Sequence, residues 1–386
     1  MAARPSQLAA YYGASFAALG VYLPYWPRWL EARGVTGLAL GLVAAIVPAV
    51  AIVAPLVVGA IADALRLRAA ILRVACGASL CAFSCIALAG AGPLNHGAGP
   101  LGVAFLVAAT AVFALARAPM VLVADVIALE QTSGSGEYGA LRRFGSLGFL
   151  VAVTATSLWV PLDHPFAMPA LVALASGLAL IASMGLPARA TPIPRPERVG
   201  VLSFVRRPGV PSFLLAVALL HAAHASYDLT FSLRLRELGM DDRWVGPTWA
   251  IGVAAEVAVF SLVGRMNRVG GHETLLLIAA LGGAARWSLL AVVQSASLAA
   301  WLQPLHAISF GCMWLGATGF VAERAPRDQL ASAQGTFTAC AAAGNAAGML
   351  ACGSLHASHG GRAVFGAAAL LALLAAVPAW ATRRAR

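Results

Sequence analysis

Long apolar stretches separated by short polar loops run through this chain from end to end. Each stretch has about the 20 residues that a helix needs to cross a bilayer, and none alternates in the manner of an outer-membrane strand. We therefore predict an all-α integral membrane protein with twelve transmembrane helices. The predicted spans are residues 8–28, 38–62, 70–91, 101–127, 141–160, 166–186, 211–233, 245–265, 273–293, 298–321, 330–355 and 362–381.

One connection is longer than the others and divides the predicted spans into two groups of six. Residues 187–210 are rich in Pro and Arg, which predicts a cytoplasmic linker between an N-terminal bundle (residues 1–186) and a C-terminal bundle (residues 211–386). Three glycines also recur at one offset: Gly34, Gly41 and Gly59 reappear as Gly239, Gly246 and Gly264. Such an internal repeat is typical of secondary transporters, whose binding site lies between the repeats near the midplane.

Composition supports the membrane class and gives the basic charge a meaning. The 386 residues are 60% hydrophobic and 11% charged, whereas soluble domains carry about 25% charged residues. The net charge of +11 comes entirely from Arg, and most Arg residues fall in the loops that we expect on the cytoplasmic side. This asymmetry predicts that both termini are cytoplasmic. We accordingly expect membrane lipid, and no nucleic acid, as the partner of the basic loops.

Ionisable residues stand inside the predicted spans, where a charge costs about 2.5–3.5 kcal/mol on insertion. Those that we single out are Arg117 and Asp125 in the fourth span, and Asp228, Glu256, Arg286 and His306 in the seventh to tenth. Such residues normally face a bundle interior or a water-filled path, so they are candidates for a substrate and proton site. Arg117 and Asp125 either pair with each other or line the N-terminal half of the cavity.

Arg286 and Glu256 have complementary chemistry for coupled transport. Arg286 can hold a carboxylate with two parallel hydrogen bonds and keeps its charge. Burial favours the protonated form of Glu256, whereas a nearby Arg favours the ionised form. We hypothesise that substrate binding to Arg286 releases Glu256 to take up a proton. The alternative is a permanent Glu256–Arg286 pair that only fixes two helices together.

Histidines and aromatic residues extend this candidate site. His221, His224 and Asp228 share one helix face at i, i+3 and i+7. Three ligands on one helix are an incomplete metal set, so we expect no metal and favour a proton relay or a polar cavity wall. Cavity lining is the interpretation that we favour for His306, and Tyr227, Phe231, Trp26 and Trp287 could wall an aromatic substrate.

A loop after the second span resembles a known transporter signature. The run is Gly59-Ala-Ile-Ala-Asp63-Ala-Leu-Arg66-Leu-Arg68. It resembles the G-x-x-x-D-x-x-G-x-R-R motif of the major facilitator superfamily, with Arg66 in place of the second Gly and Leu67 in place of the first Arg. In that family the Asp and Arg residues form a cytoplasmic charge lock. The resemblance implies the major facilitator fold and a gating role for Gly59, Asp63, Arg66 and Arg68.

Further segments are similar to the branch that contains the lactose and phenylpropionate permeases. They are Glu137-Tyr-Gly139-Ala-Leu-Arg142-Arg143, Ala255-Glu256, Ala285-Arg286-Trp287 and Gln303-Pro-Leu-His306. The resemblance implies that Glu256, Arg286 and His306 contribute to the substrate and proton site, and that Arg142 matches the Arg that meets the sugar in lactose permease. Two departures count against a sugar: Ser309 stands where that permease has a second Glu, and Asp125 is out of register with its helix-four Glu.

The resemblance and the charges together predict a secondary transporter that works by alternating access. We expect a proton symporter that imports a small organic solute, such as the aromatic monocarboxylate 3-phenylpropionate, with sugar or nucleoside import as alternatives. A drug:proton antiporter is disfavoured because the fifth span has its only Pro at the far end, Pro161. A non-transporting membrane sensor is the alternative of another class.

We expect neither enzymatic activity nor a cofactor, because the chain has no HExxH or GxSxG motif and a proton gradient can supply the energy. The Arg-only, Ala-rich composition is typical of a GC-rich bacterial genome. We therefore expect the protein in the bacterial cytoplasmic membrane. We also expect it to be a monomer.

Overall fold

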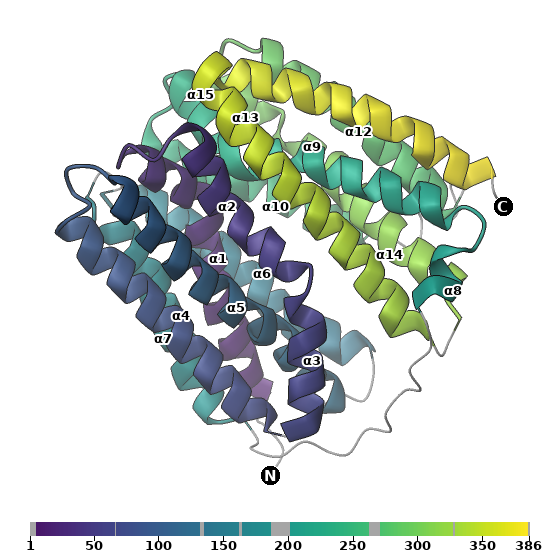
Figure 1. Ribbon diagram of the computed structural model, residues 1–386, viewed down its shortest axis with the longest axis horizontal. Coiled ribbons are helices and arrows are strands. Elements are labelled where there is room, and N and C mark those ends of the chain that lie inside the picture. The colour runs from purple at the N-terminus through teal and green to yellow at the C-terminus, as the bar shows by residue number, and fades with distance from the viewer. Residues whose placement is uncertain are drawn as a thin grey trace. The chain divides into compact units, whose positions relative to one another are not determined.

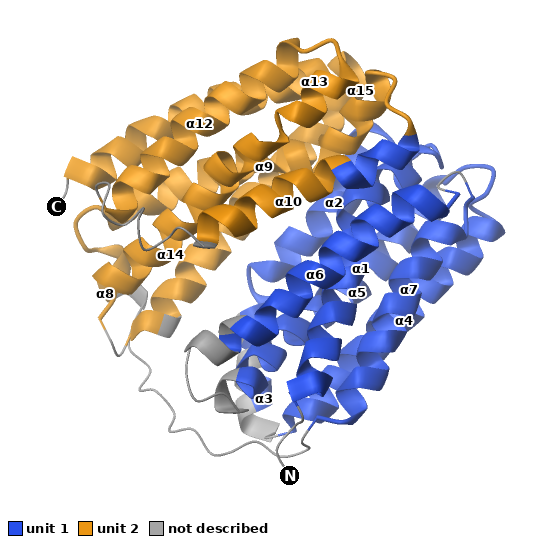
Figure 2. Ribbon diagram, turned by 180° about the vertical axis from the view of Figure 1, so that it is seen from behind, with its two compact units in different colours: residues 1–194, 242–247 blue, residues 195–241, 248–386 orange. Residues whose placement is uncertain are grey.

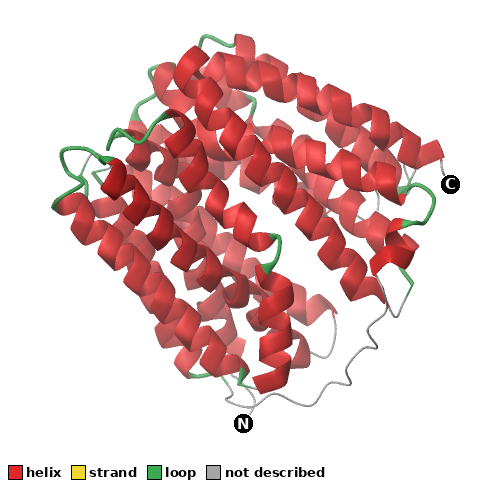
Figure 3. Cartoon of the chain, viewed as in Figure 1, coloured by secondary structure: helices red, strands yellow, loops and turns green. Residues whose placement is uncertain are grey.

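Helices are the only regular structure in the part of the chain that the computed structural model describes (Figure 3). That part comprises residues 5–65, 67–131, 135–161, 164–186, 201–261, 271–326 and 329–384. Among these residues, seven helical stretches are long and apolar enough to cross a membrane. The chain is thus an all-helical, multi-pass membrane protein; twelve spans and cytoplasmic termini stay predictions.

The chain forms two compact units (Figure 2). Unit 1 comprises residues 1–194 and 242–247, and unit 2 comprises residues 195–241 and 248–386. The predicted linker begins in residues 187–200, which lie outside the described residues. A short helix, α8 (Val201–Val205), follows within the predicted linker and packs against α9 (Val210–Glu237).

Unit 1 contains seven helices (Figure 1), among its described residues: α1 (Pro5–Glu31), α2 (Gly37–Ala51), α3 (Ala54–Leu65), α4 (Arg68–Ala91), α5 (Pro100–Gln131), α6 (Ser135–Trp159) and α7 (Ala167–Met184). Helix α1 packs along α6 and α7, and α4 packs against α5 and α7. A short turn, η1 (Asp242–Trp244), also belongs to this unit because Asp242 pairs with Arg28 of α1 and the Arg243 carbonyl accepts a hydrogen bond from Ser157.

Unit 2 is built around α9 and the long α15 (Leu330–Arg384), which pack along each other. Its other described elements are α8, most of α10 (Val245–Ser261), α12 (His272–Val292), α13 (Ala296–Trp301), η3 (Gln303–Leu305), η4 (Ala307–Gly311) and α14 (Cys312–Arg324). The core joins α9, α12, α14 and α15; Phe213, for example, stacks on Phe320 with ring centroids 4.3 Å apart. Helix α15 turns at Gly360, whose φ of +72° falls in the left-handed region that favours glycine.

Two predicted spans are interrupted in the structure. The span predicted at 38–62 divides into α2 and α3 at Ile52–Val53, where both amides bond to carbonyls three residues back. Pro55 lies two residues after Val53 and has no N–H, so an interruption of the helical hydrogen bonds costs little here. The span predicted at 298–321 divides into α13, η3, η4 and α14 around Pro304. Each break thus falls at a proline of an apolar segment.

The internal repeat appears in the structure as two matching helix ends. Gly34 and Gly239 both have positive φ, at 73° and 76°. The Gly34 and Val35 amides bond to the carbonyls of Glu31 and Leu30. The Gly239 and Met240 amides bond to those of Arg236 and Leu235 in the same pattern. Each pair of bonds is the Schellman arrangement that ends a helix, so the recurring glycine marks the same turn in both halves.

Small residues let the main helix pairs of each unit approach closely. In unit 1, a Cβ added at Gly148 of α6 would collide with the Gly13 carbonyl oxygen of α1. In unit 2, a Cβ at Gly344 of α15 would collide with the Ala218 carbonyl oxygen of α9. The crossing point is therefore built in the same way twice, since Ala218 stands 205 residues after Gly13.

We expect Gly148→Ala to lower the unfolding temperature of the detergent-solubilised protein. The added methyl group has no space, and overpacking of this kind costs about 1–3 kcal/mol. Gly77→Ala is the matched control, because a Cβ at Gly77 meets nothing within 4 Å. Thermal unfolding followed by tryptophan fluorescence compares the two variants. Equal midpoints would contradict the close α1–α6 contact.

Candidate functional site

Arg286 is a fully buried cation at the centre of a polar cluster in unit 2. It lies on α12 with 0% of its surface exposed. One terminal nitrogen donates to Nδ1 of His306 at 3.1 Å and to Oγ of Ser309 at 2.9 Å. The other donates to Oε1 of Gln303 at 2.8 Å, and Nε is buried without a hydrogen-bond partner. Within the described residues, Arg286 forms no ion pair with a carboxylate.

His306 connects Arg286 to Glu256. A guanidinium can only donate hydrogen bonds, so Nδ1 of His306 must accept, and the ring proton must lie on Nε2. Nε2 stands 3.2 Å from Oε2 of Glu256 on α10, and it therefore donates to this carboxyl group. The order Arg286–His306–Glu256 is a hydrogen-bonded chain in which the histidine is neutral. The directly bonded Glu256–Arg286 pair considered from the sequence is not formed, because the imidazole stands between the two side chains.

Asp228 forms a second acidic site in the same unit. Its Oδ1 lies 3.6 Å from Nε2 of His224, one turn earlier on α9. Its Oδ2 accepts a hydrogen bond from Nδ2 of Asn345 on α15 at 3.1 Å. His221 is turned away from this group, since its Nδ1 lies 3.0 Å from the carbonyl oxygen of Val217. Among the described residues, no group of three His, Cys, Asp or Glu side chains has the arrangement of a metal site.

Aromatic rings surround the two acidic sites. The Arg286 guanidinium lies 4.5 Å from the ring centroids of both Tyr227 and Trp287. The rings of His224 and His306 are 5.4 Å apart, and both contact the ring of Phe310. The Tyr227 hydroxyl is buried without a hydrogen-bond partner. A guanidinium between two aromatic faces gains cation–π attraction, which is strongest where water is excluded.

A short irregular segment supplies three of the partners of Arg286. Gln303 lies in the 3₁₀ turn η3, His306 follows it, and Ser309 lies in the π-helical turn η4. Residues three apart share a face in a 3₁₀ turn, which places Gln303 and His306 on the side of Arg286. Single π turns inside helices are frequent at functional sites. The break around Pro304 therefore occurs where it brings these polar side chains to Arg286.

Unit 1 contains a separate charged cluster. Arg142 on α6 donates to Oδ1 of Asp125 on α5 at 2.8 Å, and the Tyr12 hydroxyl of α1 donates to the same oxygen at 2.7 Å. Arg117 donates instead to the hydroxyl of Ser15 at 3.0 Å. The structure thus joins Asp125 to Arg142. Arg117, which lies on α5 like Asp125, bonds instead to Ser15 of α1. Asp125 was judged out of register from the sequence, but it meets Arg142 directly.

Residues 6–367 match the MFS_1 like family. The chain belongs to this family. Its membership in the major facilitator superfamily identifies it as a membrane transporter. It is 30% identical over 383 residues to the "Probable 3-phenylpropionic acid transporter" of Escherichia coli (strain K12). The aligned region covers 95% of this chain and 94% of that protein. It is 29% identical over 323 residues to the maltose permease of Geobacillus stearothermophilus, over 81% and 76% of the two chains.

Solved transporters share the fold of this MFS_1-like chain. The nucleoside transporter NupG superposes with a TM-score of 0.81 at 15% identity and covers 98% of both chains. A POT family transporter in complex with 5-aminolevulinic acid superposes with a TM-score of 0.75 at 10% identity, covering 97% of this chain and 95% of that one. At these identities the likeness concerns the fold alone.

The remaining predicted positions of this major facilitator protein are less informative. Trp26 is 1% exposed and packs among Tyr22, Trp29 and Phe83, within unit 1. Phe231 is 0% exposed and stacks on Tyr227. In the predicted charge lock, Gly59 and Asp63 fall within α3 and Arg68 begins α4, whereas Arg66 lies outside the described residues. The lock stays a prediction.

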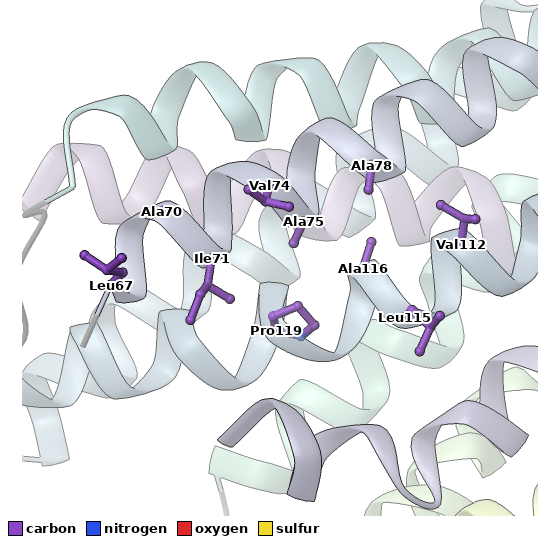
Figure 4. A pocket seen from close by; sticks show the side chains of 10 residues that line it. All are labelled: Leu67, Ala70, Ile71, Val74, Ala75, Ala78, Val112, Leu115, Ala116 and Pro119. Atoms are coloured by element: carbon purple, nitrogen blue, oxygen red, sulfur yellow. The ribbon is translucent and has the colours of Figure 1, made fainter. Parts of the chain in front are cut away.

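An apolar pocket of about 500 Å³ lies between α4 and α5 of this transporter (Figure 4). Ile71 and Val74 on α4 line it together with Leu115 and Pro119 on α5. All ten lining residues are apolar. A substrate site needs a few polar groups that fix orientation, so we place no substrate in this pocket.

Gln303 and Asn345 are the site residues of this transporter that the sequence reasoning missed. Both are amides inside apolar segments, and both bond to an ionisable side chain that was predicted. An unpaired amide is costly at bilayer depth, so an isolated Asn in the run Cys340–Gly348 was a usable signal. Ser309 was noted only as a departure from lactose permease, yet it accepts a hydrogen bond from Arg286.

Proposed function

We propose that this protein imports a small aromatic monocarboxylate, such as 3-phenylpropionate, together with protons, across the bacterial cytoplasmic membrane. The observation that carries the proposal is the bonding of Arg286. Its described donors reach neutral partners, and Nε has none. A buried cation without a bonded counter-charge is costly, and a substrate carboxylate could supply that charge through paired hydrogen bonds.

The surrounding groups fit the remainder of such a substrate. The rings of Tyr227 and Trp287 flank Arg286, so an aromatic ring attached to the carboxylate would find apolar and aromatic neighbours. The identity to the probable 3-phenylpropionic acid transporter supports the same substrate class.

The hydrogen-bonded chain suggests how protons would be coupled. A substrate carboxylate that draws Arg286 away frees Nδ1 of His306, which can then accept a proton. The resulting imidazolium faces Glu256, so the proton can rest on either group. This proposal replaces a direct exchange between Arg286 and Glu256 by one that passes through His306. Alternating access of the two six-helix bundles, residues 1–186 and 211–386 joined by the 187–210 linker, would carry the loaded site across.

Sugar import is a second candidate, favoured by two observations. The chain is 29% identical to a maltose permease, and the Tyr12–Asp125–Arg142 cluster of unit 1 combines donors and acceptors that could bind hydroxyl groups. The charge of that cluster is already balanced, which suits a neutral substrate.

Uptake into proteoliposomes tests the two candidates against each other. The purified full chain is reconstituted, and labelled 3-phenylpropionate or maltose is added with and without an inward proton gradient; uptake by protein-free liposomes is subtracted. We expect gradient-dependent accumulation of 3-phenylpropionate alone. Accumulation of maltose alone would favour sugar import and overturn the carboxylate proposal.

A further inference from the structure

Unit 2 holds two carboxyl groups that are bonded separately. Glu256 meets His306, whereas Asp228 meets His224 and Asn345. They come from different helices, α10 and α9. Among the described residues, no hydrogen bond joins either carboxylate to Arg286. The two groups are therefore independent sites for a proton.

The charges of this cluster do not balance once an anion is present. With both carboxylates ionised, this cluster presents one buried cation, Arg286, and two acidic side chains largely withdrawn from water, Asp228 and Glu256, which are 21% and 16% exposed. A substrate carboxylate would neutralise Arg286 and leave both acidic side chains without a counter-charge. An uncompensated charge away from water costs several kcal/mol. Protonation of both side chains removes this cost.

We propose that Asp228 is a second proton-binding site, so that each monocarboxylate crosses with two protons. This inference rests on the proposed import of a carboxylate. One proton binds an oxygen of Asp228, and the other binds at Glu256 and His306. Both are released to the inner solution with the substrate, and the empty carrier returns with both carboxylates ionised and Arg286 again bonded to His306. One negative and two positive charges cross together. Each cycle therefore moves one positive charge inward.

The polar and charged groups around Asp228 are compatible with proton binding there. The groups facing it are His224 on its own helix, and Asn345 and Cys352 on α15, with Arg286 of α12 within electrostatic range. Glu256 faces His306 and, within electrostatic range, Tyr227. Tyr227 lies within electrostatic range of both Asp228 and Glu256.

A membrane potential without a pH gradient separates the two-proton cycle from a one-proton cycle. Proteoliposomes with wild-type protein, at equal pH on both sides, receive an inside-negative potassium diffusion potential and labelled 3-phenylpropionate. One net charge per substrate gives a tenfold accumulation at about 59 mV. We expect this value for wild type. Asp228→Asn should keep uptake driven by a pH gradient and lose the response to potential, while Glu323→Gln, an exposed acid-to-amide control, should behave as wild type.

The outcomes distinguish this inference from the proposed function. Uptake under a pH gradient combined with no response of wild type to potential means one proton per substrate, and overturns the second site. An absence of uptake under either force overturns the proposed import itself. The charge moved per labelled substrate in wild type, recorded on a solid-supported membrane, decides the stoichiometry even if Asp228→Asn fails to fold.

Discussion

Arg286→Lys should lower the transport efficiency, kcat/KM, for 3-phenylpropionate by about 100-fold. Arg286 directs its two terminal nitrogens to three partners, and a lysine has one nitrogen on a flexible stem. It cannot hold a carboxylate with two parallel bonds. A hydrogen bond to a charged group contributes about 1.5–3 kcal/mol, and 1.4 kcal/mol corresponds to a factor of ten. Initial uptake rates over a range of substrate concentrations measure the loss.

Arg383→Lys is the matched control, because Arg383 is exposed in the last turn of α15. It should transport at the wild-type rate. Thermal unfolding of Arg286→Lys checks that the fold is kept, so that the lost transport can be assigned to binding. Wild-type efficiency in a folded Arg286→Lys variant would show that the guanidinium does not hold the substrate.

Glu256→Gln should lose most of the accumulation driven by a pH gradient while it keeps exchange of external for internal substrate. Glutamine can still accept the hydrogen bond from His306, but it cannot bind and release a proton. We expect accumulation to fall by about tenfold or more and exchange to stay within about twofold. Asp228 still binds one proton in the two-proton cycle, so accumulation falls without disappearing. Parallel assays of uphill uptake and counterflow measure both steps.

Glu323→Gln again serves as the comparison, because the Glu323 side chain is 51% exposed. Its accumulation should match that of wild type. Unchanged accumulation in Glu256→Gln would remove Glu256 from the coupling mechanism. Loss of exchange together with accumulation would assign it a role in binding the substrate.

Much of unit 2's polar cluster could be predicted because burying a charge is expensive. Arg286, Glu256, His306 and Asp228 each stand out as single positions in an apolar segment, and the structure brings the first three into one hydrogen-bonded chain. The order of contact within the cluster could not be predicted. It depends on the rotation of each helix about its axis and on the turns η3 and η4, which a pattern of apolar residues does not record.

The helical class of the fold and its internal repeat could also be predicted from the sequence. Helical class followed from the length and apolarity of the segments, and the repeat followed from glycines whose positive φ is required at Gly34 and Gly239. Pro55 and Pro304 mark the interruptions, but the extent of each break could not be predicted, because membrane helices often continue through a proline when neighbours satisfy the freed carbonyl. The Asp125–Arg142 pair was missed because spacing along two helices does not reveal how far one slides past the other.

The π turn η4 makes the length of this segment as important as its side chains. A π turn bonds each amide five residues back instead of four, so it stores one extra residue between His306 and α14. Deleting one residue inside η4 would convert it to an ordinary α-helical turn, and the face of α14 that carries Met313, Ala317 and Phe320 would stay in the core. Ser309, which lies inside the turn, would change its position relative to Arg286. A one-residue deletion within α14 itself has no stored residue to remove and would rotate everything after it by about 100°. A deletion in η4 should therefore disturb the site and keep the packing of the unit, whereas a deletion in α14 should disrupt the packing.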